Sequence, residues 1–135
     1  ADAEWSRWKQ SQPFSWPHVE GQRADIIPKK AEDTDFLYLY DLKAGYMGWS
    51  RPGEDLAFAY LFDKEVFPYC WYFASYGGFY RHYTAVLEPC TAMPCSVLEA
   101  SASGQCSVLK AGESIETTVR IYAGKESELA LRGVK

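Results

Sequence analysis

Residues 83–122 read YTAVLEPCTAMPCSVLEASASGQCSVLKAGESIETTVRIY, and this stretch decides the fold class. It opens with a strand-like run that ends at Glu88, directly before Pro89, and then enters a loop of small residues. A short strand-like run leads to the turn 110–114. The final run alternates two sets of side chains, namely Ile115, Thr117, Val119 and Ile121 against Glu116, Thr118 and Arg120. That alternation predicts a β-strand over 114–122, in a sheet with one wetter face.

The sequence before this stretch predicts further strands joined by short turns. Residues 35–42 carry apolar or aromatic side chains at most positions, which predicts a strand buried on both faces. The runs 46–49 and 56–62 flank the sequence RPGED, and this order predicts a hairpin with a Pro-Gly turn. The run 68–73 leads to Gly77-Gly78, a pair typical of a turn or of a close approach between two backbones.

Shorter runs complete the expected elements. Residues 83–88 and 105–110 predict two more strands, and residues 96–103 predict one helical turn that Gly104 stops. About seven strands without a long helix indicate an all-β chain, folded as an antiparallel β-sandwich.

A length of 135 residues indicates a single domain, 1–135. We expect three parts within it: an irregular Trp- and Pro-containing segment 1–34, a sandwich core 35–123 and a charged tail 124–135. Trp5, Trp8 and Trp16 make the first segment too apolar for a free tail, so we expect this segment to lie on the fold.

Composition narrows the classes of partner. The net charge is −4, and the chain has no basic cluster, so nucleic acid and anionic membrane are not expected partners. No apolar run approaches the length of a membrane span, and the start lacks a signal-peptide pattern. We therefore expect a cytoplasmic protein.

The four cysteines have neither the CxxC spacing nor the nearby histidines of a zinc site, so no metal is expected. No Gly-rich phosphate loop is present, and no cofactor is expected. In a reducing compartment the thiols stay free. We expect Cys70 and Cys106 to be reduced and buried, and Cys90 and Cys95 to be unpaired.

Several short motifs resemble the C-terminal half of the galactose-mutarotase-like β-supersandwich, the fold of the aldose 1-epimerase superfamily. They are Leu87-Glu88-Pro89, the turn Leu109 to Ser114, and the following strand 115–122. The upstream pieces Leu61-Phe62-Asp63, Phe67-Pro68, Trp71 and Gly77-Gly78 are similar as well. The resemblance covers about residues 35–123, and it implies that this chain corresponds to half of the family's larger sandwich.

The same resemblance implies a sugar ligand and acid–base chemistry. Mutarotation needs a base for the anomeric hydroxyl and an acid for the ring oxygen. Glu88 matches the family's base by its motif, and His18 in Trp16-Pro17-His18 resembles the acid. The plainer alternatives are a sheet-end carboxylate bonded to backbone or arginine at Glu88, and a loop histidine at His18.

Aromatic residues make up 16% of the chain and supply candidate sugar platforms. We single out Trp49, Trp71 and Tyr76 for stacking on a sugar, although such side chains serve cores more often than ligands. Arg81 and His82 are candidates for binding a distal part of an oligosaccharide, and a solvated edge pair is the alternative.

We therefore expect a carbohydrate-binding, mutarotase-like domain with possible epimerase-type chemistry at Glu88. Two alternatives stay open: a non-catalytic sugar-binding or interaction module, and a half-domain that works only when paired with another chain. Half a sandwich leaves edges and an apolar face exposed, so we expect a homodimer. A Trp-rich segment that folds back over the same face would instead allow a monomer.

Overall fold

The computed structural model describes residues 6–9 and 12–129, and these form two compact units. The first unit contains the described residues up to Leu39 together with Trp71–Glu88. The second contains Tyr40–Cys70 and the described residues from Pro89 onward. Strands in antiparallel sheets dominate both units, with one short α-helix, so the expected all-β class with sandwich-like sheets is confirmed. Trp5 and the end of the tail lie outside the described residues.

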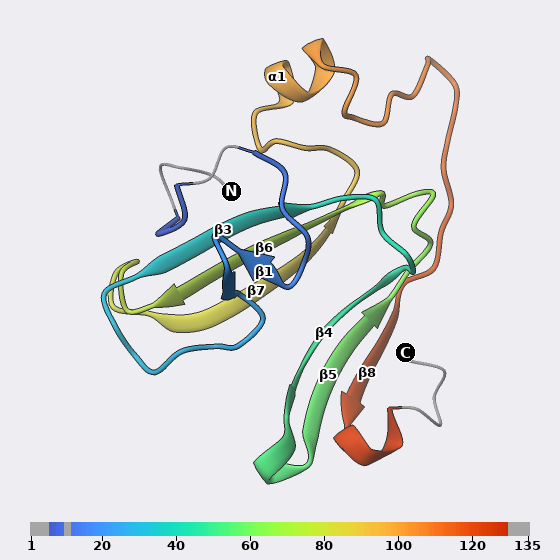
Figure 1. Ribbon diagram of the computed structural model, residues 1–135. Helices are drawn as coiled ribbons and strands as arrows, with labels where there is room; N and C mark the ends of the chain where they lie inside the picture. Colours follow the sequence, from blue (N-terminus) through green and yellow to red (C-terminus); the bar gives the residue numbers. More distant parts are fainter. Residues whose placement is uncertain (1–5, 10–11, 130–135) are drawn as a thin grey trace. The chain divides into compact units, whose positions relative to one another are not determined.

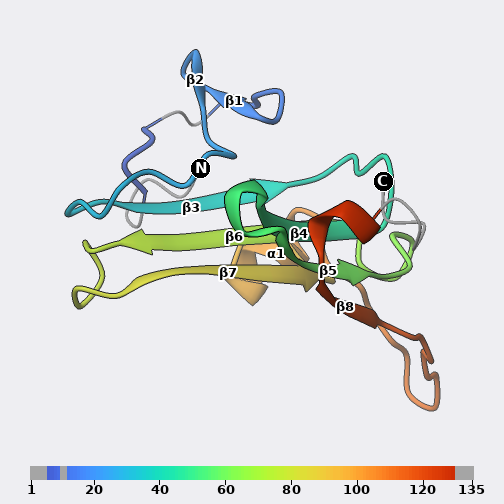
Figure 2. The same cartoon turned by 90° about the horizontal axis from the view of Figure 1, so that it is seen from below.

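The sheet of the first unit contains β3 (Thr34–Leu39), β6 (Tyr69–Tyr76) and β7 (Tyr83–Cys90), in the order β3-β6-β7. The three strands run side by side in both views (Figure 1, Figure 2). The first residues of β6 and the last of β7 belong to the second unit. All three strands were expected, but β6 and β7 extend beyond the predicted ends, and the expected strand 35–42 ends at Leu39.

The two faces of this sheet differ in burial. Side chains at alternate positions of a strand point to opposite faces. Asp35, Leu37, Tyr72 and Tyr76 are buried on one face. Phe36 on the other face is only half-buried, as are its neighbours there. The expectation that strand 35–42 is buried on both faces was therefore wrong.

The N-terminal segment covers the buried face. It contains the hairpin of β1 (His18–Val19) and β2 (Gln22–Arg23), so the expectation of a wholly irregular segment was wrong. Glu20 and Gly21 form its turn with φ of 49° and 77°, the left-handed pair that suits a two-residue hairpin. Trp8 is 3% exposed and Trp16 packs edge-on against Tyr72, which confirms that this segment lies on the fold.

Gly77 and Gly78 allow the close approach that their sequence predicted. Gly77 has φ of 126°, and a Cβ there would lie 2.0 Å from the carbonyl oxygen of Ala31. A Cβ at Gly78 would lie 2.7 Å from the carbonyl oxygen of Glu32. Only glycine lets the end of β6 meet the segment that leads into β3.

The sheet of the second unit contains β4 (Tyr46–Arg51), β5 (Leu56–Leu61) and β8 (Arg120–Gly124), in the order β4-β5-β8 (Figure 1). The β4–β5 hairpin is confirmed, and its connection is the 3-10 turn η1 (Pro52–Glu54). Asp55 follows with φ of 48°. Its carboxylate accepts hydrogen bonds from the Ser127 backbone and hydroxyl at 2.9 and 3.0 Å, which tethers η2 (Glu126–Glu128).

Along the chain, the expected helical turn α1 (Val97–Ala102) lies between β7 and β8. The Ser96 hydroxyl caps it by accepting from the Glu99 backbone, and Gly104 follows with φ of 69°. The expected strand 105–110 was wrong, because only the isolated bridge Ala92–Cys106 forms there. Of the expected strand 114–122, only the residues from Arg120 onward are paired.

None of the four cysteines forms a disulfide, as expected. Cys70 is buried, and this burial raises the pKa of its thiol to about 12. Cys106 is only half-buried, so the expectation that it is buried was wrong. Across residues 6–9 and 12–129, none of the helices has the length and apolar character needed to cross a membrane.

Candidate functional site

Four half-buried aromatic side chains share the open face of the β3-β6-β7 sheet, and we call this set the aromatic face: Phe36, Tyr38, Trp71 and Phe73. The spacing of two residues within β3 and within β6 places each pair on one side of its strand. The rings touch across the strands, with Phe36 centred 5.9 Å from Trp71 and 5.8 Å from Phe73. Neither strand supplies more than two of these rings, so strand pairing builds the face.

The aromatic face continues to the turn between β6 and β7. Phe73 contacts Phe79 at 5.5 Å between ring centres, and Phe79 contacts Tyr80 at 4.7 Å. Tyr80 is 81% exposed. Arg81 and His82 follow in the same turn and are exposed. The two candidates for distal sugar contacts therefore lie at one end of a row of rings.

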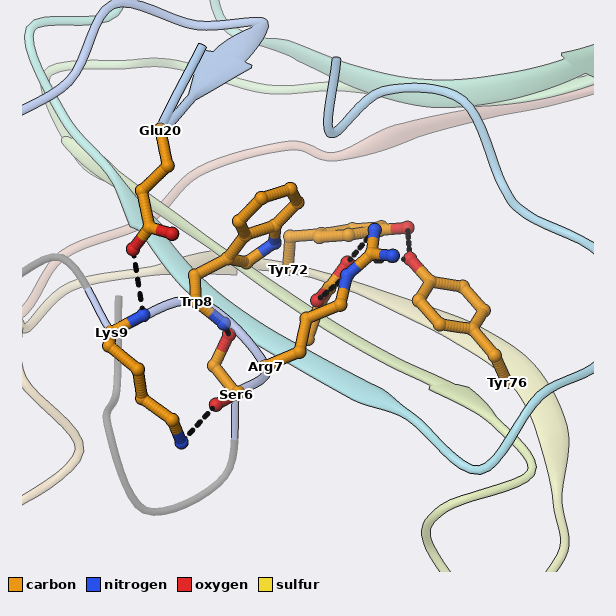
Figure 3. A network of polar contacts seen from close by, with 8 residues as sticks. Ser6, Arg7, Trp8, Lys9, Glu20, Tyr72 and Tyr76 are labelled. Atoms are coloured by element: carbon orange, nitrogen blue, oxygen red, sulfur yellow. Dashed lines mark hydrogen bonds and ion pairs between the residues drawn. The ribbon is translucent and has the colours of Figure 1, made fainter. Parts of the chain in front are cut away.

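The opposite face of the same sheet holds a buried polar network (Figure 3). Asp35 is fully buried, and it accepts two hydrogen bonds from the Arg7 guanidinium, from Nε at 2.9 Å and from a terminal nitrogen at 3.2 Å. The Tyr76 hydroxyl donates to Asp35 at 2.9 Å and lies 2.9 Å from the Tyr72 hydroxyl. Paired and hydrogen-bonded in this way, the carboxylate meets the requirement for a buried charge.

Tyr76 belongs to this network and cannot stack on a sugar, because it is 0% exposed. Its expected role as a platform was therefore wrong. Burial raises the pKa of the Tyr76 hydroxyl, and the Tyr72 hydroxyl bonded to it raises that pKa further. The phenol stays protonated and serves as a donor to Asp35. Arg7 completes the packing by lying over the rings of Trp8 and Tyr76, with its guanidinium carbon 4.5 and 5.3 Å from their centres.

Glu88 lies two residues before the end of β7 and is half-buried. Among the described residues, no side chain is hydrogen-bonded to its carboxylate or paired with its charge. Desolvation raises the pKa of Glu88 above the usual range of a glutamate. A carboxyl group of this kind can act as a general base if a donor completes the pair.

The structure does not bring an imidazole to Glu88. His18 and Glu88 belong to the same unit, yet no hydrogen bond or ion pair joins them. His18 is exposed in the β1–β2 hairpin, where its cross-strand partner is Arg23. His82, the other histidine of the chain, is exposed at the β6–β7 turn. The expected acid–base pair is therefore not assembled in this structure.

Trp49 lies in the second unit, on β4. It is 39% exposed and stacks on Phe58, its cross-strand neighbour on β5, with ring centres 6.3 Å apart. Phe58 in turn meets Tyr60 edge-on at 4.9 Å. Trp49 is therefore part of a second, smaller set of rings and does not belong to the aromatic face.

The second unit also contains an open hollow of about 380 Å³. Residues 40–42, 64–65, 68–69 and 105 line it, and four of these side chains are exposed, namely Tyr40, Asp41, Lys64 and Glu65. The Lys64 ammonium donates to the Leu42 carbonyl at 3.3 Å. None of the residues that line this hollow is buried, so the hollow does not favour any one ligand.

The sequence pointed to Trp71 and missed Phe36, Tyr38 and Phe73. The signal was present as aromatic residues at every second position in two runs, 36–38 and 71–73. Among the described residues, no cluster of three or more His, Cys, Asp or Glu side chains is placed to hold a metal ion.

Comparisons with family models, with curated proteins and with solved structures found no match to this chain.

Proposed function

We propose that this chain is a carbohydrate-binding module and that the aromatic face is its platform. The observation that carries this proposal is the set of contacting, half-buried rings on one side of the β3-β6-β7 sheet. The flat faces of aromatic rings stack on the C–H groups of a sugar, while exposed polar groups at the rim bind its hydroxyls. Trp71 contacts rings of both Phe36 and Tyr38, so it is the anchor of the platform.

The length of the row supports an oligosaccharide over a single sugar. Ring contacts run from Tyr38 and Trp71 to Phe36, and from Phe36 through Phe73 and Phe79 to Tyr80. Exposed Arg81 and His82 at the end of the row supply hydrogen-bond donors. The net charge of −4 disfavours an anionic polymer, so the ligand we propose is a neutral oligosaccharide.

Titration with a panel of soluble neutral glucans, galactans and xylans, followed by calorimetry and by NMR chemical shifts, tests this proposal. Trp71→Ala should weaken binding of the recognised glycan by at least about tenfold, as expected for a central aromatic anchor. Trp49→Ala is the matched control, since Trp49 stands in the other unit, and it should leave affinity unchanged. Shift changes confined to residues away from the β3-β6-β7 sheet would refute the platform.

A second candidate is aldose 1-epimerase-type chemistry, supported by the half-buried Glu88, which has no bonded side chain among the described residues and a raised pKa. Against it stands the absence of a histidine bonded to Glu88 within the described part of the chain. Polarimetry or NMR exchange of glucose and galactose anomers decides between the two. An activity that Glu88→Gln abolishes would favour the epimerase, and a rate equal to the uncatalysed one would favour the non-catalytic module. The expected cytoplasmic location stays a prediction, and the absence of a disulfide among the four cysteines supports it.

A further inference from the structure

An unpaired strand-like segment leads into β8. In the second unit β8 is an edge strand, because β5 is its only partner among the described strands, in the order β4-β5-β8. The pairing begins at Arg120, opposite Leu61 where β5 ends. Residues 114–119 lie before that point, and none of the described residues forms a backbone hydrogen bond with them.

The side chains of this segment suit a strand and face water. Every residue from 107 to 121 is exposed, and Ile115, Val119 and Ile121 are 52%, 41% and 65% exposed. β-Branched residues at alternate positions favour extended pairing. An unpaired edge with apolar side chains is a template for another strand. Among the described residues no strand pairs with 114–119, and β5 pairs with Arg120 and Ile121 on one side only, so we call the unpaired outer side of segment 114–121 the free edge.

We propose that the partner is the same edge of a second copy of this chain, paired antiparallel about a two-fold axis at Thr118. This register places Ile115 opposite Ile121 of the second copy and Glu116 opposite Arg120 of the second copy. Thr117 then faces Val119 of the second copy, and each pair occurs twice because the interface is isologous.

Charge complementarity selects this partner and this register. Glu116 and Arg120 are the only charged residues between 114 and 122. Pairing about Thr118 gives each of them an opposite charge, which stabilises a cross-strand pair. A shift by two residues in either direction leaves both charges opposite neutral residues. An in-register parallel arrangement places Glu116 against Glu116 and Arg120 against Arg120.

The dimer also removes apolar surface from water on the other side of the pair. Ile115 and Ile121 alternate with the charged residues, so they share the opposite face of the new strand pair. The four isoleucines of two copies then lie in two facing pairs. The aromatic face belongs to the other unit, so the loss of the dimer and the loss of sugar binding are separable results.

Charge reversal provides the first test, with sedimentation velocity at micromolar protein as the readout. Glu116→Lys and Arg120→Glu should each raise the dimer Kd at least about tenfold, because each places like charges opposite one another twice. The double variant, with both changes, restores opposite charges and should return the Kd to near that of the wild type. Glu32→Lys changes net charge equally on an exposed residue of the other unit, and it should have no effect.

Cross-linking provides a second test that does not depend on charge. In a Cys95→Ser background, Thr118→Cys places two thiols opposite each other at the two-fold axis, within the Cα separation that a disulfide allows. Mild oxidation should give a covalent dimer. Ser114→Cys places its two thiols far apart along the strands, and it should give none. A monomer at all concentrations, or a dimer insensitive to Glu116→Lys, would overturn the proposal.

Discussion

Replacement of Arg7 by Met tests the buried network of the first unit. This change keeps much of the apolar stem of the side chain but removes the guanidinium, so the fully buried Asp35 loses both charge-assisted hydrogen bonds. Asp35 keeps the Tyr76 hydroxyl as a donor at 2.9 Å. The remaining carboxylate is then a buried charge whose one donor among the described residues is the neutral Tyr76 hydroxyl. A buried charge without a charged partner lowers the stability of the folded state.

The expected loss of unfolding free energy follows from this geometry. Removing one partner of a buried ion pair costs about 3–5 kcal/mol. The Arg7 side chain is 26% exposed, so water reaches one side of the pair, and Tyr76 still donates. We therefore expect Arg7→Met to lower the free energy of unfolding by about 3 kcal/mol, the lower end of that range. The double variant Arg7→Met/Asp35→Leu removes both charges and should regain about 2 kcal/mol or more, since apolar replacement of a whole pair is close to neutral.

Urea unfolding followed by circular dichroism measures both values. With a slope of about 2 kcal/mol/M, a loss of about 3 kcal/mol lowers the midpoint by roughly 1.5 M. Arg23→Met is the matched control, because Arg23 forms an exposed pair with Asp25, and its midpoint should stay at that of the wild type. A midpoint for Arg7→Met within about 0.25 M of the wild type, or a double variant less stable than Arg7→Met, would refute the reasoning.

Three further predictions concern single residues. Gly77→Ala should lose more than about 2 kcal/mol in the same unfolding assay, from the strained φ and the clash with the Ala31 carbonyl, while Gly53→Ala, with open space around it, should lose far less. A thiol reagent at pH 8 should modify exposed Cys95 first and leave buried Cys70 unmodified until the protein unfolds, when four thiols should titrate. If Cys70 in the folded protein reacts as fast as Cys95, its burial is contradicted. In an NMR titration, the pKa of Glu88 should lie above the usual glutamate range. Because folding raises this pKa, the contribution of Glu88 to stability is most favourable below the unfolded pKa of about 4.3, and it declines as pH rises through the folded pKa. Glu88→Gln should remove that decline, and an NMR titration midpoint of Glu88 below about 4 would contradict the desolvation of its carboxyl group.

Local sequence patterns identified most of the strands and turns. Two strand-like runs, 46–49 and 56–62, with RPGED between them are a short-range signal, and this signal placed the β4–β5 hairpin correctly. The same holds for α1, whose start at Ser96 and stop at Gly104 are properties of neighbouring residues. The candidate site was predicted only in part, because Trp71 was identified while the rings that surround it were not.

The failures have a common physical cause. Runs 105–110 and 114–119 have strand-like sequences, yet a strand forms only where a partner satisfies its backbone groups, and pairing stops at Arg120. Tyr76 was taken for a platform because an aromatic residue carries the same pattern whether it faces a ligand or a buried carboxylate. Whether such a ring meets solvent or a buried carboxylate depends on which segment covers that face of the sheet.

The sequence by itself determined the all-β class, the position of the β4–β5 hairpin, the glycine close approach and the apolar N-terminal segment, because each depends on backbone preference or on periodicity within a few residues. Only the tertiary structure decided which face of the β3-β6-β7 sheet is open and which is closed. That decision depends on Arg7, which reaches Asp35 across 28 positions of sequence, and on Tyr76, which reaches it across 41. No local pattern encodes such contacts, since they form only after loop closure brings distant segments together and the burial of one carboxylate demands specific donors.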